Sequence, residues 1–303
     1  MNIVRFMIKS YNKPRIGLLD DGQLYPIAGV VGLAELLSMR LADCRRLVEA
    51  AAQDRSPPIP EDQVKLLAPI DGRMEVWAAG VTYETSREAR VEESERSASV
   101  YELVYDAQRP ELFFKSAGWR VVANNEAIAL RDDSDFDVPE PEAALVVNRF
   151  AEIVGVTVCN DVSSRSIEGA NPLYLPQAKI YLGGCALGPA VRPIWEIIDP
   201  YNLSITLEIE RHSEAAWRGE ASTGQLRRRF DELVAYLFRA DVHPDGVILS
   251  TGTCLVPQSP FKLQPGDVVR ITIGEVGTLQ NPVVRGLDNV LATRRDYLTI
   301  PPR

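Results

Sequence analysis

The chain has 303 residues, of which 46% are hydrophobic and 25% are charged, and it carries a formal net charge of −9. This composition is typical of a globular protein, and the length allows one large domain and one small domain. The negative charge argues against a nucleic-acid partner, because surfaces that bind nucleic acids are generally basic.

The sequence contains no long apolar run. No stretch comes close to the roughly 18 apolar residues that a membrane helix needs, and the N-terminal segment lacks the apolar core and cleavage site of a signal peptide. The four cysteines are widely spaced, which argues against a disulfide framework or a zinc site. We therefore expect a cytoplasmic protein without a membrane partner.

Residues 1–70 predict a small N-terminal α+β domain. Within residues 15–27, two apolar runs flank an Asp-Asp-Gly sequence, a pattern typical of a β-hairpin. Leucine and alanine recur at helical spacing in residues 32–38 and 42–54, which predicts two helices. Residues 55–70 are rich in proline, so we expect a connector to the next domain.

Residues 71–303 predict a second domain that is mostly β. Short apolar runs indicate strands at residues 76–81, 111–116, 126–130, 142–148, 152–160, 204–211, 247–256, 267–274 and 276–283. A helix is predicted around residues 230–240. Residues 83–108 form a charged helical stretch with few apolar anchors, which we interpret as a lid beside a site. Because few helices lie between the strands, the pattern favours an antiparallel or mixed β core over a doubly wound parallel sheet.

Two glutamates separated by one residue, Glu140 and Glu142, lead into the apolar run 143–147. Residues i and i+2 of a strand point to the same face, so both carboxylates can reach one point. Asp161 directly follows a second apolar run, and Lys179 completes the set. A Glu-x-Glu pair is often only a solvated face, but carboxylates at the ends of two buried strands are costly unless they are paired or bind a metal. Three oxygen ligands around one point suit a hard divalent cation such as Mg2+.

Four further residues are candidates for the same site. Glu111 opens a predicted strand that Lys115 closes, and Arg165 follows the strand that ends near the carboxylates. Thr253 lies beside Gly252, where a backbone N–H and a hydroxyl could bind an anion. Each has a plainer interpretation: Glu111 as a solvated strand start, Lys115 as a surface lysine, Thr253 as a strand residue. Arg165 could equally be a structural ion-pair residue.

Seven segments form a specific pattern along the chain: PELFFK (110–115), EPEAALVVN (140–148), NDVSSRS (160–166), AKIY with GGCALGP (178–189), STGT (250–253), LQPGDVV (263–269) and GTLQNPV (277–283). Together they resemble the fumarylacetoacetate hydrolase superfamily. The resemblance implies a β-roll of mixed sheets, and Mg2+ held by Glu140, Glu142 and Asp161, with Mn2+ or Ca2+ as substitutes. It also implies a homodimer or homotetramer.

The sequence departs from the hydrolases of that superfamily at one loop. These hydrolases carry an Asn-Tyr-x-x-His loop that, with a nearby glutamate, activates water. Here Tyr83 is kept, but Thr82 replaces the asparagine and Ser86 replaces the histidine. The loop therefore lacks an imidazole, with a pKa near neutrality, that could act as the base that activates water. Hydrolysis of a C–C bond is disfavoured for this reason.

Residues 166–181 instead resemble the branch that dehydrates 2-keto-3-deoxy sugar acids, the D-arabinonate and D-xylonate derivatives, to 2,5-dioxopentanoate. By that similarity, Glu111 and Lys179 lie close to the reacting carbons. Similarity alone leaves open which of the two is the acid and which is the base.

The predicted activity is therefore that of a metal-dependent hydro-lyase acting on a small 2-oxo acid through an enolate. Lys179 would transfer a proton near C3 and Glu111 would act at C4 and C5, or the reverse. The expected substrate-binding residues are Ser86, Arg87, Arg90, Arg165 and Thr253. The alternatives are an acylpyruvate hydrolase, an oxaloacetate decarboxylase or a tautomerase, and, less favoured, a non-catalytic binding protein.

Overall fold

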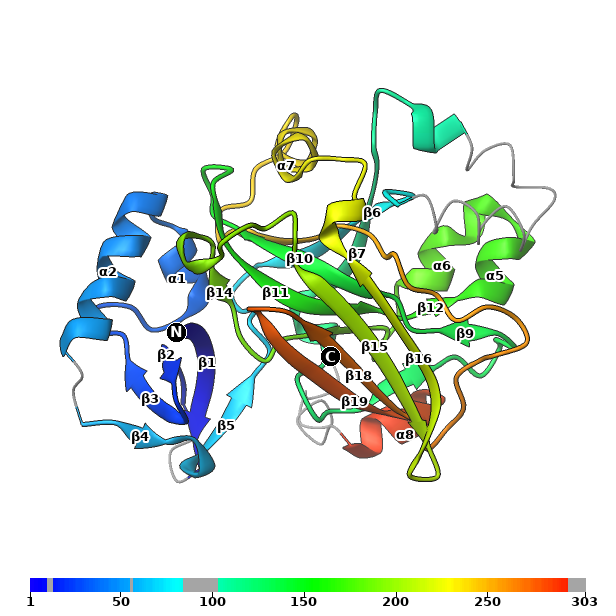
Figure 1. The fold of residues 1–303 in the computed structure, drawn as a ribbon, viewed down its shortest axis with the longest axis horizontal. Helices are drawn as coiled ribbons and strands as arrows, with labels where there is room; N and C mark the ends of the chain where they lie inside the picture. The colour runs from blue at the N-terminus through cyan, green and yellow to red at the C-terminus, as the bar shows by residue number, and fades with distance from the viewer. Residues whose placement is uncertain (10–12, 55–56, 84–102, 294–303) are drawn as a thin grey trace, which may run out of the picture.

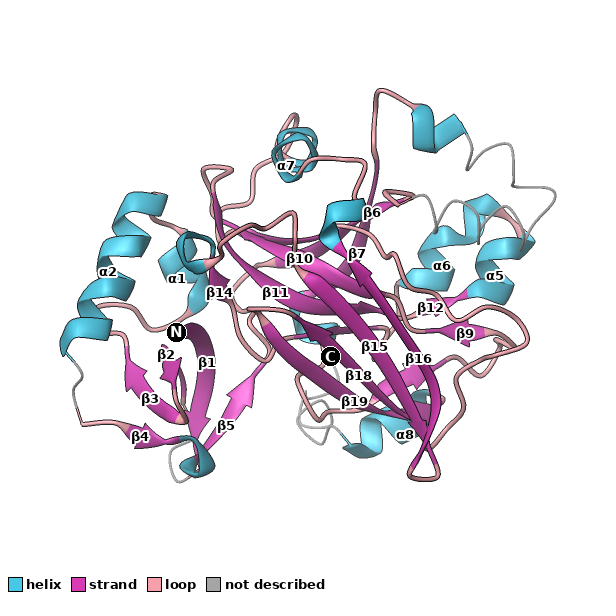
Figure 2. Cartoon of the chain, in the orientation of Figure 1, coloured by secondary structure: helices cyan, strands magenta, loops and turns pink. Residues whose placement is uncertain are grey.

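The computed structural model describes residues 1–9, 13–54, 57–83 and 103–293 (Figures 1 and 2). Strands account for more of these residues than helices, so the predicted class, α+β and mostly β, is confirmed. The strands form an N-terminal sheet, a central sheet, an outer sheet and a short two-stranded pair.

The N-terminal sheet has the order β4-β3-β2-β1-β5. Its strands are β1 (Asn2–Ile8), β2 (Pro14–Asp20), β3 (Gln23–Pro26), β4 (Ile59–Pro60) and β5 (Val64–Leu67), accompanied by α1 (Leu33–Leu37) and α2 (Leu41–Asp54). The predicted hairpin and both predicted helices are confirmed. The predicted connector was partly wrong, because β4 pairs with β3 and β5 pairs with β1 inside this sheet.

The central sheet has the order β13-β11-β10-β17-β6-β7, and β14 pairs with β11. Its strands are β6 (Glu75–Gly80), β7 (Glu111–Ala117), β10 (Pro141–Val147), β11 (Ile153–Asp161), β13 (Cys185–Leu187), β14 (Arg192–Pro193) and β17 (Val247–Ser250). The pairs are antiparallel apart from β17 with β6, which is parallel. Every residue of β10 is buried, which explains why residues 143–147 are apolar without alternation.

The two faces of β10 belong to different hydrophobic cores. Val146 packs in a cluster with Leu36 and Leu37 of α1. Leu145 points the other way, into a cluster with Leu207 of the outer sheet. The central sheet is thus the middle layer, between the N-terminal unit and the outer sheet (Figure 1). The domain boundary after residue 70 remains a prediction.

The outer sheet has the order β16-β15-β18-β19-β8. Its strands are β8 (Ile128–Leu130), β15 (Ser204–Arg211), β16 (Glu214–Ser222), β18 (Val268–Ile273) and β19 (Gly277–Arg285). Buried residues alternate along β18 and β15, as expected for a sheet with one solvated face. His212 and Ser213 connect β15 to β16 with φ values of 53° and 65°, a backbone that suits the right-handed twist of a tight hairpin.

The remaining elements are β9 (Asp137–Val138), β12 (Ser163–Ser164), α5 (Arg165–Ala170), α6 (Leu175–Lys179), α7 (Phe230–Leu237), α8 (Leu287–Thr293) and single turns of 3-10 helix at η1 (Glu61–Gln63), η2 (Gly118–Arg120), η3 (Pro172–Tyr174), η4 (Ile194–Glu196) and η5 (Thr223–Gln225). The helix predicted around residue 230 is confirmed as α7. Within the described parts of the chain, no helix is both long and apolar enough to cross a membrane.

One further expectation, on a strand of the second domain, was wrong in part. The strand predicted over residues 247–256 ends at Ser250, because the next residues turn away and Gly252 takes a positive φ of 96°. The sequence also did not indicate α5 and α6. Most of the predicted lid, residues 84–102, lies outside the described residues.

Candidate active site

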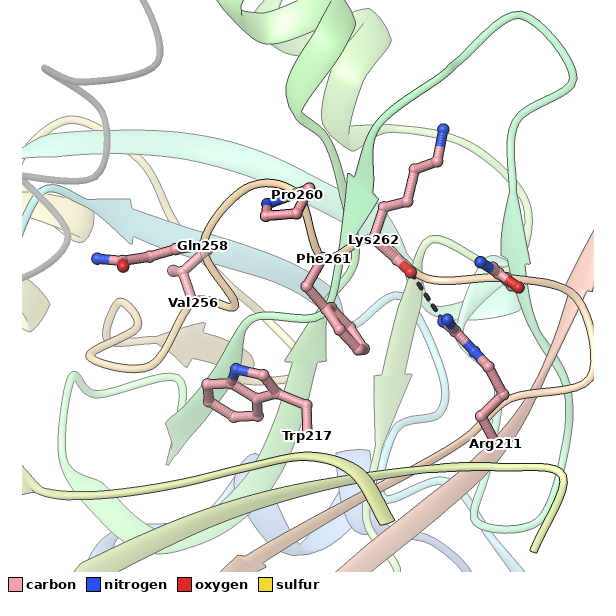
Figure 3. Close-up of a pocket in the computed structure, with 8 residues that line it drawn as sticks. Arg211, Trp217, Val256, Gln258, Pro260, Phe261 and Lys262 are labelled. Atoms are coloured by element: carbon pink, nitrogen blue, oxygen red, sulfur yellow. Dashed lines mark hydrogen bonds between the residues drawn. The ribbon is translucent and has the colours of Figure 1, made fainter. Parts of the chain in front are cut away.

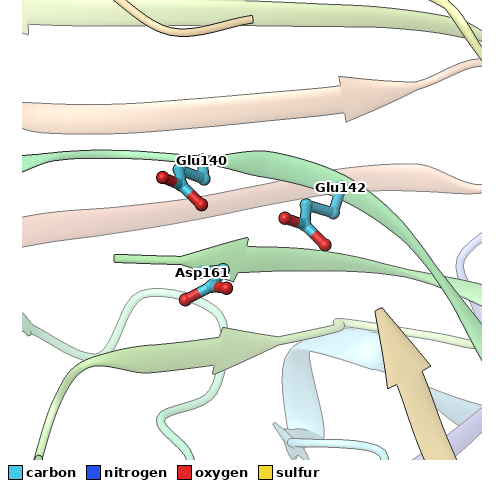
Figure 4. Close-up of side chains that lie close together, drawn as sticks. All are labelled: Glu140, Glu142 and Asp161. Carbon is cyan, nitrogen blue, oxygen red and sulfur yellow. The ribbon is translucent and has the colours of Figure 1, made fainter. Parts of the chain in front are cut away.

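The three carboxylates of the sequence motif converge at one end of β10 and β11 (Figure 4). Glu140 directly precedes β10, Glu142 lies within it, and Asp161 ends β11. The Asp161 N–H donates a 2.9 Å hydrogen bond to the Glu140 carbonyl, which fixes the two backbones side by side. One carboxylate oxygen from each residue lies within 4.8 Å of the other two, and all three residues are buried.

Lys179, the last residue of α6, reaches into this cluster and is itself buried. Its Nζ lies 2.7 Å from Oε2 of Glu140 and 3.4 Å from Oδ2 of Asp161. It also donates a 2.5 Å hydrogen bond to Oγ of Ser163. The amine is therefore held among two candidate metal ligands and a hydroxyl.

A second buried lysine, Lys115, lies at an irregularity in β7. The pairing of β6 with β7 passes from Phe114 to Ser116 and leaves Lys115 as the extra residue of a β-bulge, a feature that re-aims side chains beside functional sites. Its Nζ lies 2.5 Å from Oδ1 of Asp161. Because β10, β17 and β6 separate β7 from β11 in the sheet order, this contact requires the sheet to curl into a roll.

Arg165, the first residue of α5, supplies a third cation. One guanidinium nitrogen lies 2.8 Å from Oε1 of Glu140, and the side chain is buried. A further carboxylate, Glu168, lies 3.9 Å from the Arg165 Nε atom. The buried charges of the cluster thus lie in ion pairs, as charged groups in the low-polarity interior of a protein must.

Glu142 occupies a different electrostatic environment from its neighbours. Its Oε2 accepts a 2.8 Å hydrogen bond from the N–H of Gly252. Burial, followed by the negative charges of Asp161 and Glu140, raises the pKa of Glu142 to about 8. A cation between the three carboxylates would favour the ionised form of Glu142.

The donor set therefore fits a hard divalent cation. All three candidate ligands offer carboxylate oxygens, which Mg2+ prefers, and they lie close enough to share one ion. Burial is the largest cause of the raised pKa of Glu142, and the charge of Lys179 opposes it.

Glu111, the first residue of β7, faces the same side of the sheet as Phe113, since they pair with Gly80 and Ala78 of β6. The Phe113 ring lies 5.6 Å from Nζ of Lys179. This geometry places Glu111 on the sheet face that the Lys179 side chain covers.

The structure gives no hydrogen bond or ion pair between the carboxylates and the other predicted residues among those that it describes. The Thr253 hydroxyl donates to the carbonyl of Leu255 at 3.1 Å. The predicted substrate contacts Ser86, Arg87 and Arg90 lie outside the described residues.

Sequence reasoning missed two contributors to the site. The Ser163 hydroxyl binds Lys179, and its position inside NDVSSRS was the available signal. Thr82, noted only as a replacement for asparagine, donates a 2.6 Å hydrogen bond from its buried hydroxyl to the carbonyl of Thr251, next to Gly252. A pattern of residue types does not show this contact.

A separate pocket of about 630 Å3 lies elsewhere in the described structure (Figure 3). Its lining includes Arg211 and Trp217 from the β15–β16 hairpin and Phe261 from the loop that follows Thr253. Arg211 donates a 2.9 Å hydrogen bond to the Lys262 carbonyl at its edge. The residues that line this pocket differ from those that surround the carboxylate cluster.

Comparison with known proteins gives a consistent picture. Residues 76–284 match the family model described as "Fumarylacetoacetate (FAA) hydrolase C-terminal". The chain is 44% identical over 263 residues to a protein of Haloferax volcanii named as a probable 2-keto-3-deoxyxylonate dehydratase, covering 86% of this chain and 87% of that protein. It is 45% identical over 225 residues to the 2-dehydro-3-deoxy-D-arabinonate dehydratase of Saccharolobus solfataricus, covering 73% and 75% of the two chains.

A solved structure supports the same comparison. A 2-keto-3-deoxy-D-arabinonate dehydratase complexed with magnesium and 2,5-dioxopentanoate superimposes with a TM-score of 0.78 at 34% identity. The match covers 94% of this chain and 99% of that one.

Proposed function

Because this chain belongs to the fumarylacetoacetate hydrolase family, we propose that it is a Mg2+-dependent dehydratase that converts a 2-keto-3-deoxy pentonate to 2,5-dioxopentanoate. The named dehydratases are its relatives over most of its length. The observation that carries the proposal in this structure is a buried amine, Lys179, on the same carboxylates that would hold the metal.

Glu140, Glu142 and Asp161 would hold Mg2+. Bound there, the ion would supply Lewis-acid stabilisation of the negative charge that develops on a 2-keto acid when C3 loses a proton. The remaining tasks fall to the side chains of the protein.

Lys179 is proposed as the proton-transfer group at C3, because Glu140 and Ser163 hold its amine at a fixed point beside the carboxylates. Glu111 is proposed as the acid at the C4 end, where the hydroxyl departs as water after accepting a proton. Transfer of a proton from C5 to C3 then gives the enol of the aldehyde. This enol gains a proton at C4 as its hydroxyl loses one, so the net reaction is the loss of one water. The reverse assignment, with Glu111 as the base and Lys179 as the acid, uses the same two residues.

Further assignments remain part of the proposal. Ser86, Arg87, Arg90 and Thr253 would contact the substrate hydroxyls or carboxylate. Arg165 is also proposed to bind the substrate; the alternative is a structural ion-pair residue, and its guanidinium contacts Glu140. Mn2+ or Ca2+ would serve as substitutes for Mg2+. The protein would act in the cytoplasm, and the family resemblance implies a homodimer or homotetramer.

The test is a turnover assay of the purified protein with 2-keto-3-deoxy-D-xylonate and its D- and L-arabinonate counterparts, with Mg2+ or with EDTA. The proposal requires 2,5-dioxopentanoate to form only with the metal, and Lys179→Ala to abolish its formation. Acylpyruvate and oxaloacetate are assayed separately, as the substrates of the alternative activities. Cleavage of either one, with no turnover of the pentonates, would assign the protein to the hydrolase or decarboxylase side of the family.

A further inference from the structure

Gly80 lies directly opposite Glu111 in the pairing of β6 with β7. The carboxyl group of Glu111 folds over the α-carbon of Gly80. A Cβ atom built on residue 80 would lie 2.1 Å from Oε2 and 2.7 Å from Cδ of Glu111. The three atoms nearest to that Cβ all belong to the Glu111 side chain, so an added methyl group would collide with this one residue first.

The backbone does not itself require a glycine at this position. Gly80 is absent from the residues with positive φ, so an alanine could adopt its conformation. The reason for a glycine therefore lies in the space that the Glu111 carboxyl group occupies.

The chain beside Gly80 is poorly placed to move aside. Val81 has a φ of 52°, a left-handed conformation that is strained for a β-branched residue and persists only where the surroundings fix it. The buried hydroxyl of Thr82 then ties the turn to the carbonyl of Thr251. A side chain at residue 80 would consequently displace the flexible Glu111 carboxyl group rather than the backbone.

We propose that Gly80 is a positioning residue for the Glu111 carboxylate: its missing side chain leaves the space from which this carboxylate exchanges protons with the substrate. The inference rests on the proposed dehydratase activity, in which Glu111 acts at C4 and C5. Gly80, on β6, would then affect the reaction through the position of Glu111, without touching the substrate itself. The three atoms nearest to an added Cβ belong to Glu111 and not to Lys179 or the three carboxylates.

The test is a double-mutant cycle of wild type, Gly80→Ala, Glu111→Gln and the double variant, with kcat and KM measured at saturating Mg2+. Gly80→Ala should lower kcat about 10- to 100-fold in the wild-type background, the scale of a misplaced catalytic group. It should lower kcat less than about threefold when Glu111 is already glutamine, because the group that it displaces has lost its function. An equal loss in both backgrounds, or no loss in wild type, overturns the inference.

Gly219→Ala is the matched control. Gly219 lies in β16, and its added Cβ would lie 2.4 Å from the ring of Trp217, a residue of the separate pocket (Figure 3). It should change kcat less than about twofold, since it makes the same kind of collision away from the carboxylates. A loss in this variant equal to that in Gly80→Ala would show a general packing effect and overturn the inference.

A crystal structure of Gly80→Ala decides the question if Glu111→Gln has too little activity to measure. A shifted Glu111 carboxyl group beside an unmoved Lys179 supports the inference, and an unmoved Glu111 overturns it. Failure of the proposed function has a different signature, because wild type would then turn over none of the pentonates.

Discussion

Lys115 and Lys179 are joined by a hydrogen bond from a side chain to the main chain: Nζ of Lys115 donates to the carbonyl oxygen of Lys179 at 2.7 Å. The same Nζ contacts Asp161 at 2.5 Å. One buried amine thus connects the bulge of β7, a candidate metal ligand and the end of α6. We infer that Lys115 holds the site together, whereas Lys179 takes part in the reaction.

Lys115→Met should lower the free energy of unfolding by about 3 kcal/mol, because it removes one partner of a buried ion pair. Saturating Mg2+ should restore part of this loss, since a bound cation again compensates Asp161. Urea denaturation with and without Mg2+ measures both effects. Lys65→Met is the control, because Lys65 pairs with Glu126 at the surface and should cost less than about 1 kcal/mol. Equal losses in the two variants would contradict the role given to Lys115.

Lys179→Met should lower kcat by a factor of about 100 to 10,000, the usual contribution of a group that transfers a proton. Binding of Mg2+ should survive, because the three carboxylates remain. Titration calorimetry with Mg2+, together with steady-state kinetics, separates the two properties. A variant that turns over at the wild-type rate would exclude Lys179 from proton transfer.

Thr82→Val should weaken binding of Mg2+ as well as lower stability. It removes the donor to the Thr251 carbonyl, at a cost of about 1 to 3 kcal/mol for a buried acceptor left unpaired. It also loosens the turn beside Gly252, whose N–H binds Glu142.

Thr157→Val is the control for this prediction. Thr157 is buried and donates a 2.7 Å hydrogen bond to the Ala190 carbonyl, so the variant should lose similar stability. Its affinity for Mg2+ should stay at the wild-type value. If both threonine variants bind Mg2+ equally well, the turn at Thr82 does not support the metal site.

Acid should destabilise the fold through His243. His243 is only 6% exposed, and Phe238 packs edge-on against it with ring centroids 4.8 Å apart. Burial lowers the pKa of His243 below its usual value of 6.5, and the charges of Asp241 and Glu75 oppose this shift. The unfolded chain therefore binds a proton more readily than the folded one. The stabilising contribution of neutral His243 is present above pH 6.5 and is lost as the pH falls through the lowered pKa.

His243→Gln should consequently show a smaller decrease in melting temperature between pH 8 and pH 5 than wild type, on the basis of the usual pKa of about 6.5. His212→Gln, at the tip of the β15–β16 hairpin, should keep the wild-type decrease. A decrease that is unchanged in His243→Gln would show that other groups govern the acid sensitivity.

The strands and the three carboxylates could be predicted because their signals are local. Glu140 and Glu142 share a strand face by simple alternation, and the apolar runs beside them mark buried strands. The geometry around Lys179 could not be predicted in the same way. The short helix α6 has a proline in its first turn and is only five residues long, too short to show a helical period.

Other features depend on contacts between distant segments. The bulge that aims Lys115 at Asp161 arises from the register between β6 and β7, which residue types alone do not specify. The strained φ of Val81 and the close approach of Gly80 to Glu111 are likewise tertiary effects. At these places, contacts between distant segments hold the backbone against its local preference.

We propose that the carboxylate cluster, with Mg2+, removes water from a 2-keto-3-deoxy pentonate. The most direct test of this proposal follows the formation of 2,5-dioxopentanoate by wild type and by Glu142→Gln as the concentration of Mg2+ is raised. We expect wild type to form product with a saturating dependence on Mg2+, and Glu142→Gln to form none at the same concentrations. Product that forms equally well in EDTA, or equally well without the Glu142 carboxylate, would contradict it.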